Sequence, residues 1–390
     1  MQHYKRILSA ALVSVFSASA NAGFFSVEAR SLGMGNARVA TADIATAPFA
    51  NPGMLAFQPS REDFSLLLGA GAYLMDADGL VDKIDEYQTA YNNFTADPVG
   101  NISEGVRAVE IAQSMDGDIL APEAAVLLST GFSADKWAFA VSARADAIAA
   151  GTVTDIAQDP IELVDPTKNI LQLEGVLTSE LGVSVARNFR LFGQKMAVGV
   201  KPKYVKVDNI HLSESLSTVD TGLGDLIDNS TNDLGDYTTL DLGLVMGLTE
   251  HTQIGLVGTN LVSHTVNFIN SRGNPETISF DTQWRLGLAF RNNFLTLGAD
   301  MDLLENDALL TTQNFQALKT QFVSVGGEFN LKFMQLRVGA QKNIADGISD
   351  GAKETMYTAG LGLWFGFNLD AAVVAQSNSL GGFLQAGFRF

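Results

Sequence analysis

From residue 63 onward, apolar and polar side chains alternate in short segments with the two-residue period of a β-strand. In residues 237–249, apolar side chains occupy every second position from Leu240 to Leu248, and Asp241 lies between two of them. Since neighbouring residues of a strand point to opposite faces, this pattern predicts strands with one apolar and one polar face.

About fourteen such segments follow one another, an even number within the range of single-chain membrane barrels. Strands are expected near residues 63–74, 121–132, 136–146, 171–188, 194–208, 237–249, 252–261, 278–291, 294–303, 318–330, 333–342, 355–365, 367–376 and 381–390.

The connections between these segments alternate between long and short. The short ones are residues 133–135, 189–193, 250–251, 292–293, 331–332 and 366, and the long ones are 75–120, 147–170, 209–236, 262–277, 304–317 and 343–354. Outer-membrane barrels have short periplasmic turns and long outer loops. The order therefore favours an all-β fold, a transmembrane antiparallel β-barrel over residues 63–390 that spans the lipid bilayer.

The chain ends on an aromatic residue within an alternating segment. Phe388 and Phe390 share one face, and Arg389 falls on the other. Chain ends usually fray into water, so a terminal Phe on an apolar face is unusual in a soluble domain. The end resembles the closing strand of bacterial outer-membrane barrels, whose aromatic terminus is an assembly signal read by the insertion machinery. An edge strand of a soluble sandwich is the alternative.

The first residues have the features of a secretory signal. Lys5 and Arg6 precede an apolar run at residues 7–16, and small residues at Ala20 and Ala22 suit a signal peptidase. We expect residues 1–22 to be removed. The apolar run is too short for a membrane-spanning helix, and no later segment offers the ~20 apolar residues that one needs. A membrane location would therefore rest on strands, in the outer membrane of a Gram-negative bacterium.

Composition permits this interpretation and excludes several others. The 390 residues contain no Pro-rich, Ser-rich or charged linker, so one large domain is the simplest organisation. Cysteine is absent, which suits an oxidising compartment and excludes thiolate metal sites. A net charge of −18 would repel nucleic acid over most of the surface.

The sequence gives no support for an enzyme. The histidines have neither the His-x-x-x-His nor the His-Glu-x-x-His spacing of metal sites, and no Gly-x-Ser-x-Gly motif is present. No catalytic residue, metal or cofactor is expected.

Several charged residues fall on the polar faces of the predicted strands, where they would face the barrel lumen. Because both signs occur together, we expect a filled, hydrogen-bonded interior rather than an open ion-selective pore. Pro202 lies between two of these residues and is expected to produce a kink or bulge. The expected lumen residues are Lys201, Lys203, Asp241, Asp281, Arg285, Asp300, Asp302, Arg337 and Arg389.

The first long connection contains apolar residues at helical spacing, including Leu80, Ile84 and Tyr87 and, more loosely, Val106 and Val109. This spacing predicts helical outer loops over the barrel mouth. They would act as a lid, or they would only pack down the outer rim.

Residues 23–62 have neither a helical nor a strand period, and small residues recur in them. Gly33-Met-Gly35 and Asn51-Pro52 follow an aromatic start at Gly23-Phe24-Phe25. This order resembles the N-terminal hatch of the FadL-like outer-membrane transport family, in which Gly33 and Gly35 would allow close packing and Asn51-Pro52 would turn the chain toward the first strand. A loosely structured leader is the alternative.

A closer resemblance is to the β-barrel family known as conjugal transfer protein TraF. It rests on Val198-Gly-Val-Lys-Pro-Lys-Tyr204, Gly298-Ala-Asp-Met-Asp-Leu303, Gly327-Glu-Phe329, Leu336-Arg-Val-Gly339 and Gly387-Phe-Arg-Phe390. The resemblance implies a fourteen-stranded barrel with an N-terminal hatch and, by analogy, passage of hydrophobic molecules.

Two functions from different classes remain open. The first is a passive channel for hydrophobic or long-chain lipid-like compounds, in which Gly23, Phe24 and Phe25 bind cargo; a permanent plug is the alternative role for the two Phe residues. The second is a structural or assembly component of a surface or conjugal-transfer apparatus, whose acidic loops bind a partner.

Deletion of Phe390 tests its role as an assembly signal. The deletion is expected to lower the amount of inserted barrel without changing the activity of the barrels that assemble. Insertion at native expression is the measurement, and wild-type levels in the deletion strain would refute the role.

Overall fold

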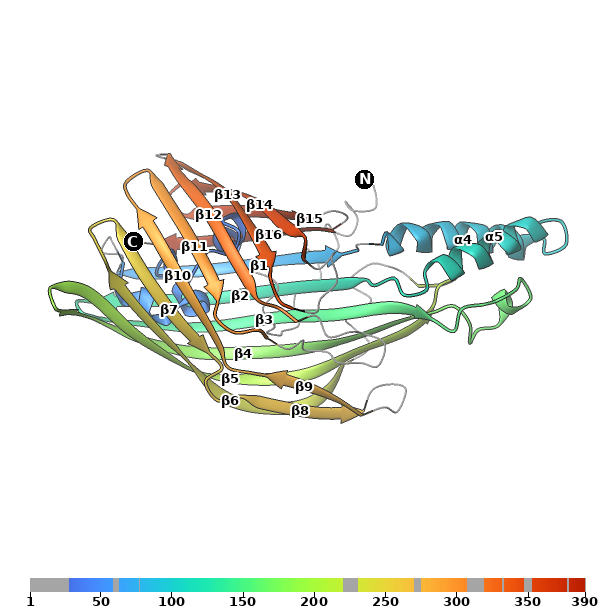
Figure 1. Cartoon of the computed structure of the whole chain (residues 1–390), viewed down its shortest axis with the longest axis horizontal. Coiled ribbons are helices and arrows are strands. Elements are labelled where there is room, and N and C mark those ends of the chain that lie inside the picture. The colour runs from blue at the N-terminus through green and yellow to red at the C-terminus, as the bar shows by residue number, and fades with distance from the viewer. Residues whose placement is uncertain are drawn as a thin grey trace.

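The alternating segments form one closed antiparallel β-barrel in the computed structural model of the chain (Figure 1). The structure describes residues 28–58, 63–76, 78–219, 231–269, 275–306, 319–331, 333–346, 353–376 and 379–389. Fourteen strands follow one another around the barrel, and the first strand pairs with the last to close it. The predicted all-β barrel is thus confirmed.

In barrel order, the wall consists of β1 (Phe64–Met75), β16 (Ser379–Arg389), β15 (Asn368–Gln376), β14 (Thr355–Trp364), β13 (Met334–Asn343), β12 (Phe322–Leu331), β11 (Leu295–Asp302), β10 (Gln283–Arg291), β7 (Thr252–Thr259), β6 (Thr231–Gly247), β5 (Gln194–Ser215), β4 (Ile170–Leu191), β3 (Trp137–Thr154) and β2 (Ala121–Ala134).

Each strand presents one face to the lumen and one to the outside, as the alternation predicts. In β6, Asp241 and Val245 are buried inside, whereas Leu244 is exposed outside. In β10, Arg285 is buried inside and its neighbours on both sides face outward. An exposed apolar wall around a buried polar lumen is the arrangement that a bilayer requires.

Exposed aromatic side chains gather near one end of the barrel. This end, which we call the short-turn end, carries the short connections such as those from β2 to β3 and from β14 to β15. Aromatic girdles mark the boundary between hydrocarbon and water in membrane barrels. The exposed aromatic residues there are Phe132, Trp137, Phe139, Phe192, Phe294, Phe329, Phe333, Phe365 and Phe388.

The strand predicted over residues 278–291 is in fact two strands. β9 (Pro275–Phe280) pairs with β8 (His264–Ile269) in a separate two-stranded sheet, and the barrel strand β10 begins only at Gln283. Alternation shows which side chains share a face but not what they pack against. Phe268 and Phe280 of this hairpin are buried with apolar residues on the lumen faces of β5 and β6, so the apolar positions before Gln283 do not face lipid.

The kink or bulge expected at Pro202 is found only in part, because the strand pairing is interrupted there but the register shift lies elsewhere. Pairing between β4 and β5 is interrupted between Gly182↔Lys203 and Val185↔Val200, yet the register is the same on both sides. The register shift lies further along, between Val207 and Asp208 in the pairing of β5 with β6. Pro202 therefore interrupts the hydrogen bonding between β4 and β5, because proline has no backbone N–H group to donate. It inserts no extra residue into the strand.

The helices predicted in the first long connection are confirmed as α4 (Leu80–Ala96) and α5 (Ile102–Ser114). Asp76 begins α4 by accepting hydrogen bonds from the backbone N–H groups of Leu80 and Val81, at 2.6 and 3.2 Å. The pair projects beyond the strands at the opposite end, which we call the long-loop end (Figure 1). In the described part of the chain, no helix is both long and apolar enough to cross a membrane.

A closed barrel without a free edge resists unfolding in detergent, because every wall strand is paired on both sides. The protein is therefore expected to fractionate with membranes and to run faster on gels unheated than boiled. Recovery of the mature chain as a soluble species would contradict the architecture.

Candidate functional site

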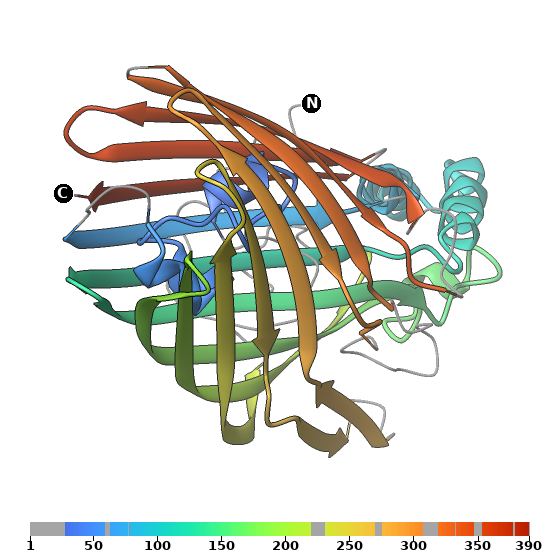
Figure 2. The same ribbon diagram turned by 60° about the vertical axis from the view of Figure 1, so that its left-hand side comes forward.

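The segment before β1 lies inside the barrel toward the short-turn end (Figure 2). We call residues 28–57 the hatch; they include α2 (Ala29–Gly33), α3 (Ala47–Ala50) and the 3-10 helix η1 (Pro52–Ala56). Every hatch residue is buried except Arg38, which is half-buried. Helices of one turn are not stable alone in water, so the hatch depends on its contacts with the wall.

One set of contacts is a belt of glycines on eight neighbouring wall strands, β14 to β5 in barrel order. A Cβ atom added at any of them would lie 3.0 Å or closer to a hatch atom. Because real Cβ atoms do not approach other heavy atoms so closely, side chains there would push the hatch off the wall. The glycine belt consists of Gly360, Gly339, Gly326, Gly298, Gly287, Gly255, Gly243 and Gly199.

The hatch glycines expected to allow close packing lie against this belt. Gly33 faces Gly360, and a Cβ on either would be 3.0 Å from the other's Cα. Gly35 has a positive φ of 62°, and an added Cβ would lie 2.5 Å from the backbone nitrogen of Ala340. Both the conformation and the space at this position therefore favour glycine.

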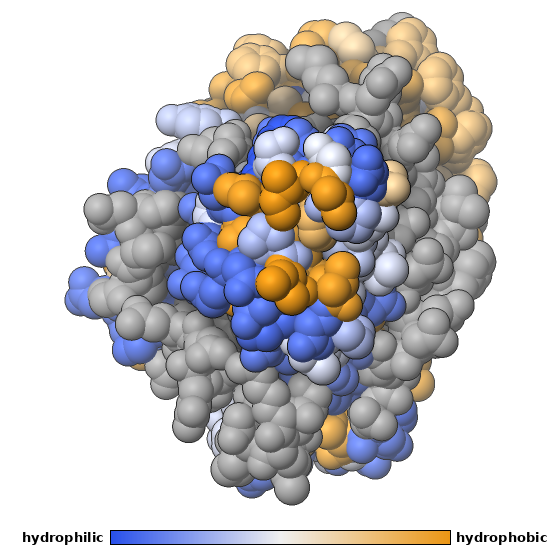
Figure 3. Space-filling view, turned by 90° about the vertical axis from the view of Figure 1, so that its right-hand side faces the viewer, coloured by the Kyte–Doolittle hydropathy of each residue, from blue (hydrophilic) through white to orange (hydrophobic). Residues whose placement is uncertain are grey.

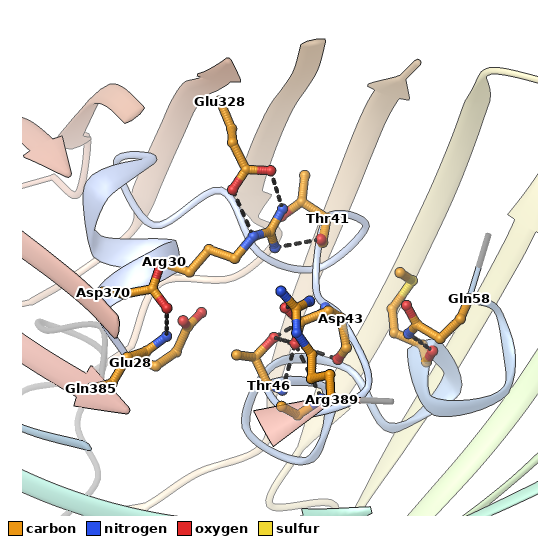
Figure 4. A network of polar contacts seen from close by, with 12 residues as sticks. Glu28, Arg30, Thr41, Asp43, Thr46, Gln58, Glu328, Asp370, Gln385 and Arg389 are labelled. Carbon is orange, nitrogen blue, oxygen red and sulfur yellow. Dashed lines mark hydrogen bonds and ion pairs between the residues drawn. The ribbon is translucent and has the colours of Figure 1, made fainter. Parts of the chain in front are cut away.

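A second set of contacts is a buried chain of charges from hatch to wall, of which Figure 4 shows Arg30 with Glu328 and Asp370 with Gln385. Arg30 of α2 binds Glu328 of β12 through two contacts, Nε to Oε2 at 2.9 Å and Nη2 to Oε1 at 3.0 Å. Glu328 also accepts from Arg337 Nε at 2.8 Å, and Arg337 Nη1 donates to Asp370 at 2.6 Å. We call these four residues the ionic chain. Each member is paired, as burial of charge requires.

The chain of contacts returns to the hatch through Gln385 of β16. Its amide nitrogen donates to Asp370 at 3.1 Å, and its oxygen accepts from the backbone N–H of Ala29 at 2.9 Å. The wall side chains thus bind both the Arg30 side chain and the backbone of α2. They hold this helix in one position and pair its charge.

Asp43 joins the middle of the hatch to the last strand. Arg389 Nη1 lies 2.8 Å from its carboxylate, and the backbone N–H groups of Ala45 and Thr46 donate to it at 3.1 Å. Burial alone would raise the pKa of the Asp43 carboxyl, but the charges of Arg389 and Arg30 hold it below its ordinary value. Asp43 therefore stays ionised in its contact with the wall.

Asn51 and Pro52 have a different place from the one expected. They begin η1 on the inner wall, and β1 starts only at Phe64. The Asn51 side chain accepts from Gly53 N at 2.9 Å and donates to Val39 O at 3.0 Å. Asn51 thus ties two hatch turns together and does not lead directly into the first strand.

Two expected lumen residues, Lys201 and Lys203 of β5, are buried inside the barrel, and Pro202 between them faces outward. Lys201 pairs with Glu180 of β4, and Lys203 lies 3.1 Å from Glu180 and 3.0 Å from Asp241. This cluster neutralises its own charges within the lumen.

The two expected acidic residues of β11, Asp300 and Asp302, are also bound inside the barrel. Arg285 pairs with Asp302 through Nε at 2.6 Å and Nη2 at 3.2 Å. Asp300 accepts from the backbone N–H groups of Arg38 and Val39, at 2.7 and 2.9 Å. The wall therefore holds the hatch backbone here too.

Asp281 is the exception, and its expected place in the lumen is wrong. It lies between β9 and β10 and is exposed. The alternation was extended through a strand that in fact ends at Phe280.

The remaining candidates are only partly described. Gly23, Phe24 and Phe25, and the terminal Phe390, lie outside the described residues. Phe388 is exposed on the outer face of β16, with its ring 5.9 Å from that of Phe367.

Comparison with known proteins agrees with this architecture. A family model described as "F plasmid transfer operon, TraF, protein" matches residues 48–302, more than half of the chain. The chain belongs to this TraF family. No curated protein matches it.

Solved structures show that this TraF-family chain has the FadL-type fold. The toluene transporter TbuX of Ralstonia pickettii superposes with a TM-score of 0.50 at 13% identity, covering 94% of this chain and 97% of that one. The toluene transporter TodX of Pseudomonas putida gives 0.50 at 14%, covering 93% and 98%. A Pseudomonas aeruginosa FadL homologue gives 0.50 at 12%, covering 94% and 99%. At such identities the likeness concerns the fold, and both resemblances seen in the sequence are confirmed.

Beside the hatch, the lumen of this TraF barrel has an apolar side. Ala29 and Leu32 of α2 and Phe49 of α3 pack in one cluster with large apolar side chains from the lumen faces of several strands. We call these wall residues the lumen apolar cluster: Leu67, Tyr73, Leu127, Phe322, Met356, Val374 and Phe383. Apolar side chains next to polar anchoring groups are typical of sites for hydrophobic ligands.

A concave region of about 1040 Å³ lies on the other side of the wall. Most of the large apolar side chains that line it, such as Leu68, Leu128 and Leu181, face outward and are exposed. This region therefore lies mainly on the outer surface of the barrel.

Sequence reasoning missed several members of the site. Glu180 and Glu328 fall on the polar faces of predicted strands, so the alternation could have placed them in the lumen. Arg30 and Asp43 carry no such signal, because the hatch has no regular period and their partners lie about three hundred residues away.

The glycine belt can be tested with two neighbouring glycines of β12. Gly326→Ala would place a Cβ against the backbone of Met34, whereas Gly327→Ala faces outward, 3.2 Å from the end of the Leu297 side chain. We expect Gly326→Ala to destabilise the barrel by about 1–3 kcal/mol, the usual cost of overpacking. The measurement is the temperature at which the folded gel band is lost in detergent.

Gly327→Ala serves as the matched control and is expected to behave like the wild type. Equal transition temperatures for the two variants would show that the belt does not hold the hatch.

Proposed function

We propose that the chain is a passive channel in the outer membrane of a Gram-negative bacterium and conducts hydrophobic or long-chain lipid-like compounds. The observation that carries the proposal is the lumen apolar cluster, which adjoins α2 in a lumen where several of the buried charges are paired with one another. Paired charges bind a mobile ion weakly, whereas contact between apolar side chains and an apolar solute is favourable in water. The toluene transporters of the same fold support this class of cargo. The proposal includes no catalytic role.

The hatch would form the floor of the cargo site. Its residues are packed on the glycine belt and tied to the ionic chain, so it fills the short-turn end of the lumen. A straight, water-filled path along the axis is not compatible with this packing. Cargo would instead contact the lumen apolar cluster and the adjoining face of α2.

Residues immediately before α2 would complete that site. Phe24 and Phe25 precede Glu28, which adjoins Ala29 and Leu32 at the lumen apolar cluster. Burial of a large apolar side chain stabilises by about 1.5–3 kcal/mol, so two adjacent phenylalanines favour contact with apolar surface. We propose that Gly23, Phe24 and Phe25 bind cargo; a permanent plug is the alternative. The closing strand would be read by the insertion machinery through Phe388 and Phe390.

A structural role in a surface or conjugal-transfer apparatus is the second candidate. The observation in its favour is a set of exposed apolar side chains at the end of the α4–α5 pair, including Val99 and Ile102.

The channel proposal is tested by replacing Phe24 and Phe25 with serine in a strain without other such channels. Uptake of a panel of long-chain and aromatic hydrophobic compounds is expected to fall for at least one compound that the wild type imports. Phe192→Ser is the control, because Phe192 is fully exposed in the turn between β4 and β5.

If the double variant assembles normally and imports every compound as the wild type does, these residues do not contact cargo. If the wild type itself imports none of the panel above the level of the empty strain, the channel function is wrong.

A further inference from the structure

The end of the α4–α5 pair carries apolar side chains that nothing in the described chain covers. Val99 in the turn between the helices is 90% exposed, Ile102 is 54% exposed and Val106 is 45% exposed. The spacing of four residues places Ile102 and Val106 on one face of α5, and Val99 precedes them in the turn. Seen end-on, apolar groups lie at the centre of this surface with hydrophilic residues around them (Figure 3).

The helical pair does not need this stripe for its own core. The opposite face of α5 is buried, with Gly105 against the ring of Phe94 in α4 and Ala108 and Ala112 in the cluster beneath. That cluster includes Leu163 and reaches the outer ends of the strands. The exposed stripe is therefore additional apolar surface, which is unfavourable in water unless a partner covers it.

A second exposed group lies in the next long connection. Ile161 precedes the 3-10 helix η2 (Glu162–Val164) and is 82% exposed, and Val164, the last residue of η2, is 59% exposed. Leu163, between them, is buried in the cluster under α5. One buried anchor thus fixes two exposed neighbours beside α5, and we call the five exposed residues Val99, Ile102, Val106, Ile161 and Val164 the tip patch.

The surroundings of the tip patch are strongly acidic. Residues 78–120 have a net charge of −7 and residues 155–169 have −3, which together exceed half of the chain's −18. Two of the few bases there are already paired: Lys83 lies 2.5 Å from Asp118, and Arg107 lies near Glu86 and Glu104. The uncompensated charge on this surface is therefore negative.

This charge decides which kind of partner fits. A second copy of the chain would bring the same negative surface to the contact, and an anionic lipid surface would also be repelled. A polypeptide with lysine or arginine beside apolar residues would cover the exposed apolar side chains and also pair with the acidic residues around them. Apolar residues three or four positions apart on a helix form a surface that a second, amphipathic helix can pack against.

We propose that the tip patch is a docking site for a basic amphipathic helix of a partner protein. The helix would place its apolar face on Val99, Ile102 and Val106, and its basic residues would face exposed acidic side chains such as Glu110. Ile161 and Val164 extend the contact beyond the end of the stripe. The docking site is independent of the channel in the barrel below.

The test uses the purified full-length barrel in detergent and three synthetic eighteen-residue peptides. The first is an amphipathic helix of leucine and lysine, the second has glutamate in place of lysine, and the third has serine in place of leucine. The tip variant is Ile102→Ser, Val106→Ser and Ile161→Ser. The matched control is Val262→Ser, Leu304→Ser and Ile344→Ser, which removes as many exposed apolar side chains from other long-loop connections.

The leucine–lysine peptide is expected to bind the wild type and the control variant equally and the tip variant at least tenfold more weakly. The serine–lysine peptide should bind all three proteins equally, because it senses only charge. Added salt should weaken binding, since the surface charges are screened. Retention of the folded gel band and of helical circular dichroism confirms that the tip variant is folded.

Three results would overturn the proposal. One is equal binding of the leucine–lysine peptide to the tip variant and the wild type. Another is equally tight binding of the leucine–glutamate peptide. The third is association of the wild type with itself, or with phosphatidylglycerol vesicles, that the tip variant loses.

Discussion

The pairing of buried charges between hatch and wall is the constraint on which the rest of the lumen depends. Glu328 lies between two guanidinium groups, one from the wall strand β13 and one from the hatch helix α2. Removal of one partner from a buried ion pair typically costs 3–5 kcal/mol, because the remaining charge stays buried and unpaired. The barrel without its hatch would leave Glu328 short of a partner and Asp300 without its backbone donors. Hatch and barrel are thus one folding unit, although the hatch contributes no strand.

The glycine belt and the ionic chain have complementary effects. The glycines set the distance, since Gly339 and Gly360 bring the hatch backbone onto the wall. The charges set the position along the wall, since Arg30 forms two hydrogen bonds with the carboxylate of Glu328. Close packing is nondirectional, whereas bidentate hydrogen bonds are directional. Together they fix one placement for a segment whose helices are too short to be stable alone.

The sequence predicts the wall far better than its contents, for a physical reason. Alternation is a local signal, and it identified the strand faces and the inward side of Lys201 and Arg337 correctly. It carries no information about pairing partners, so the β8–β9 hairpin was missed and Asp281 was misplaced. Hatch contacts such as Arg30 with Glu328 join residues far apart in the chain and have no period. Only the small residues at Gly33 and Gly35 indicated that close packing was needed.

Pairing inside the barrel also determines where the protein's charge acts. Within the lumen, Asp43 of the hatch pairs with Arg389 of β16, and Lys203 of β5 pairs with Glu180 of β4 and Asp241 of β6. The net negative charge is therefore concentrated in the long connections, around the α4–α5 pair. A field of this sign at the long-loop end attracts a basic partner and repels anionic solutes, while it leaves uncharged molecules unaffected. An uncharged hydrophobic cargo would then meet no electrostatic barrier on its way to the lumen apolar cluster, so the acidic tip and the proposed channel are compatible in one molecule.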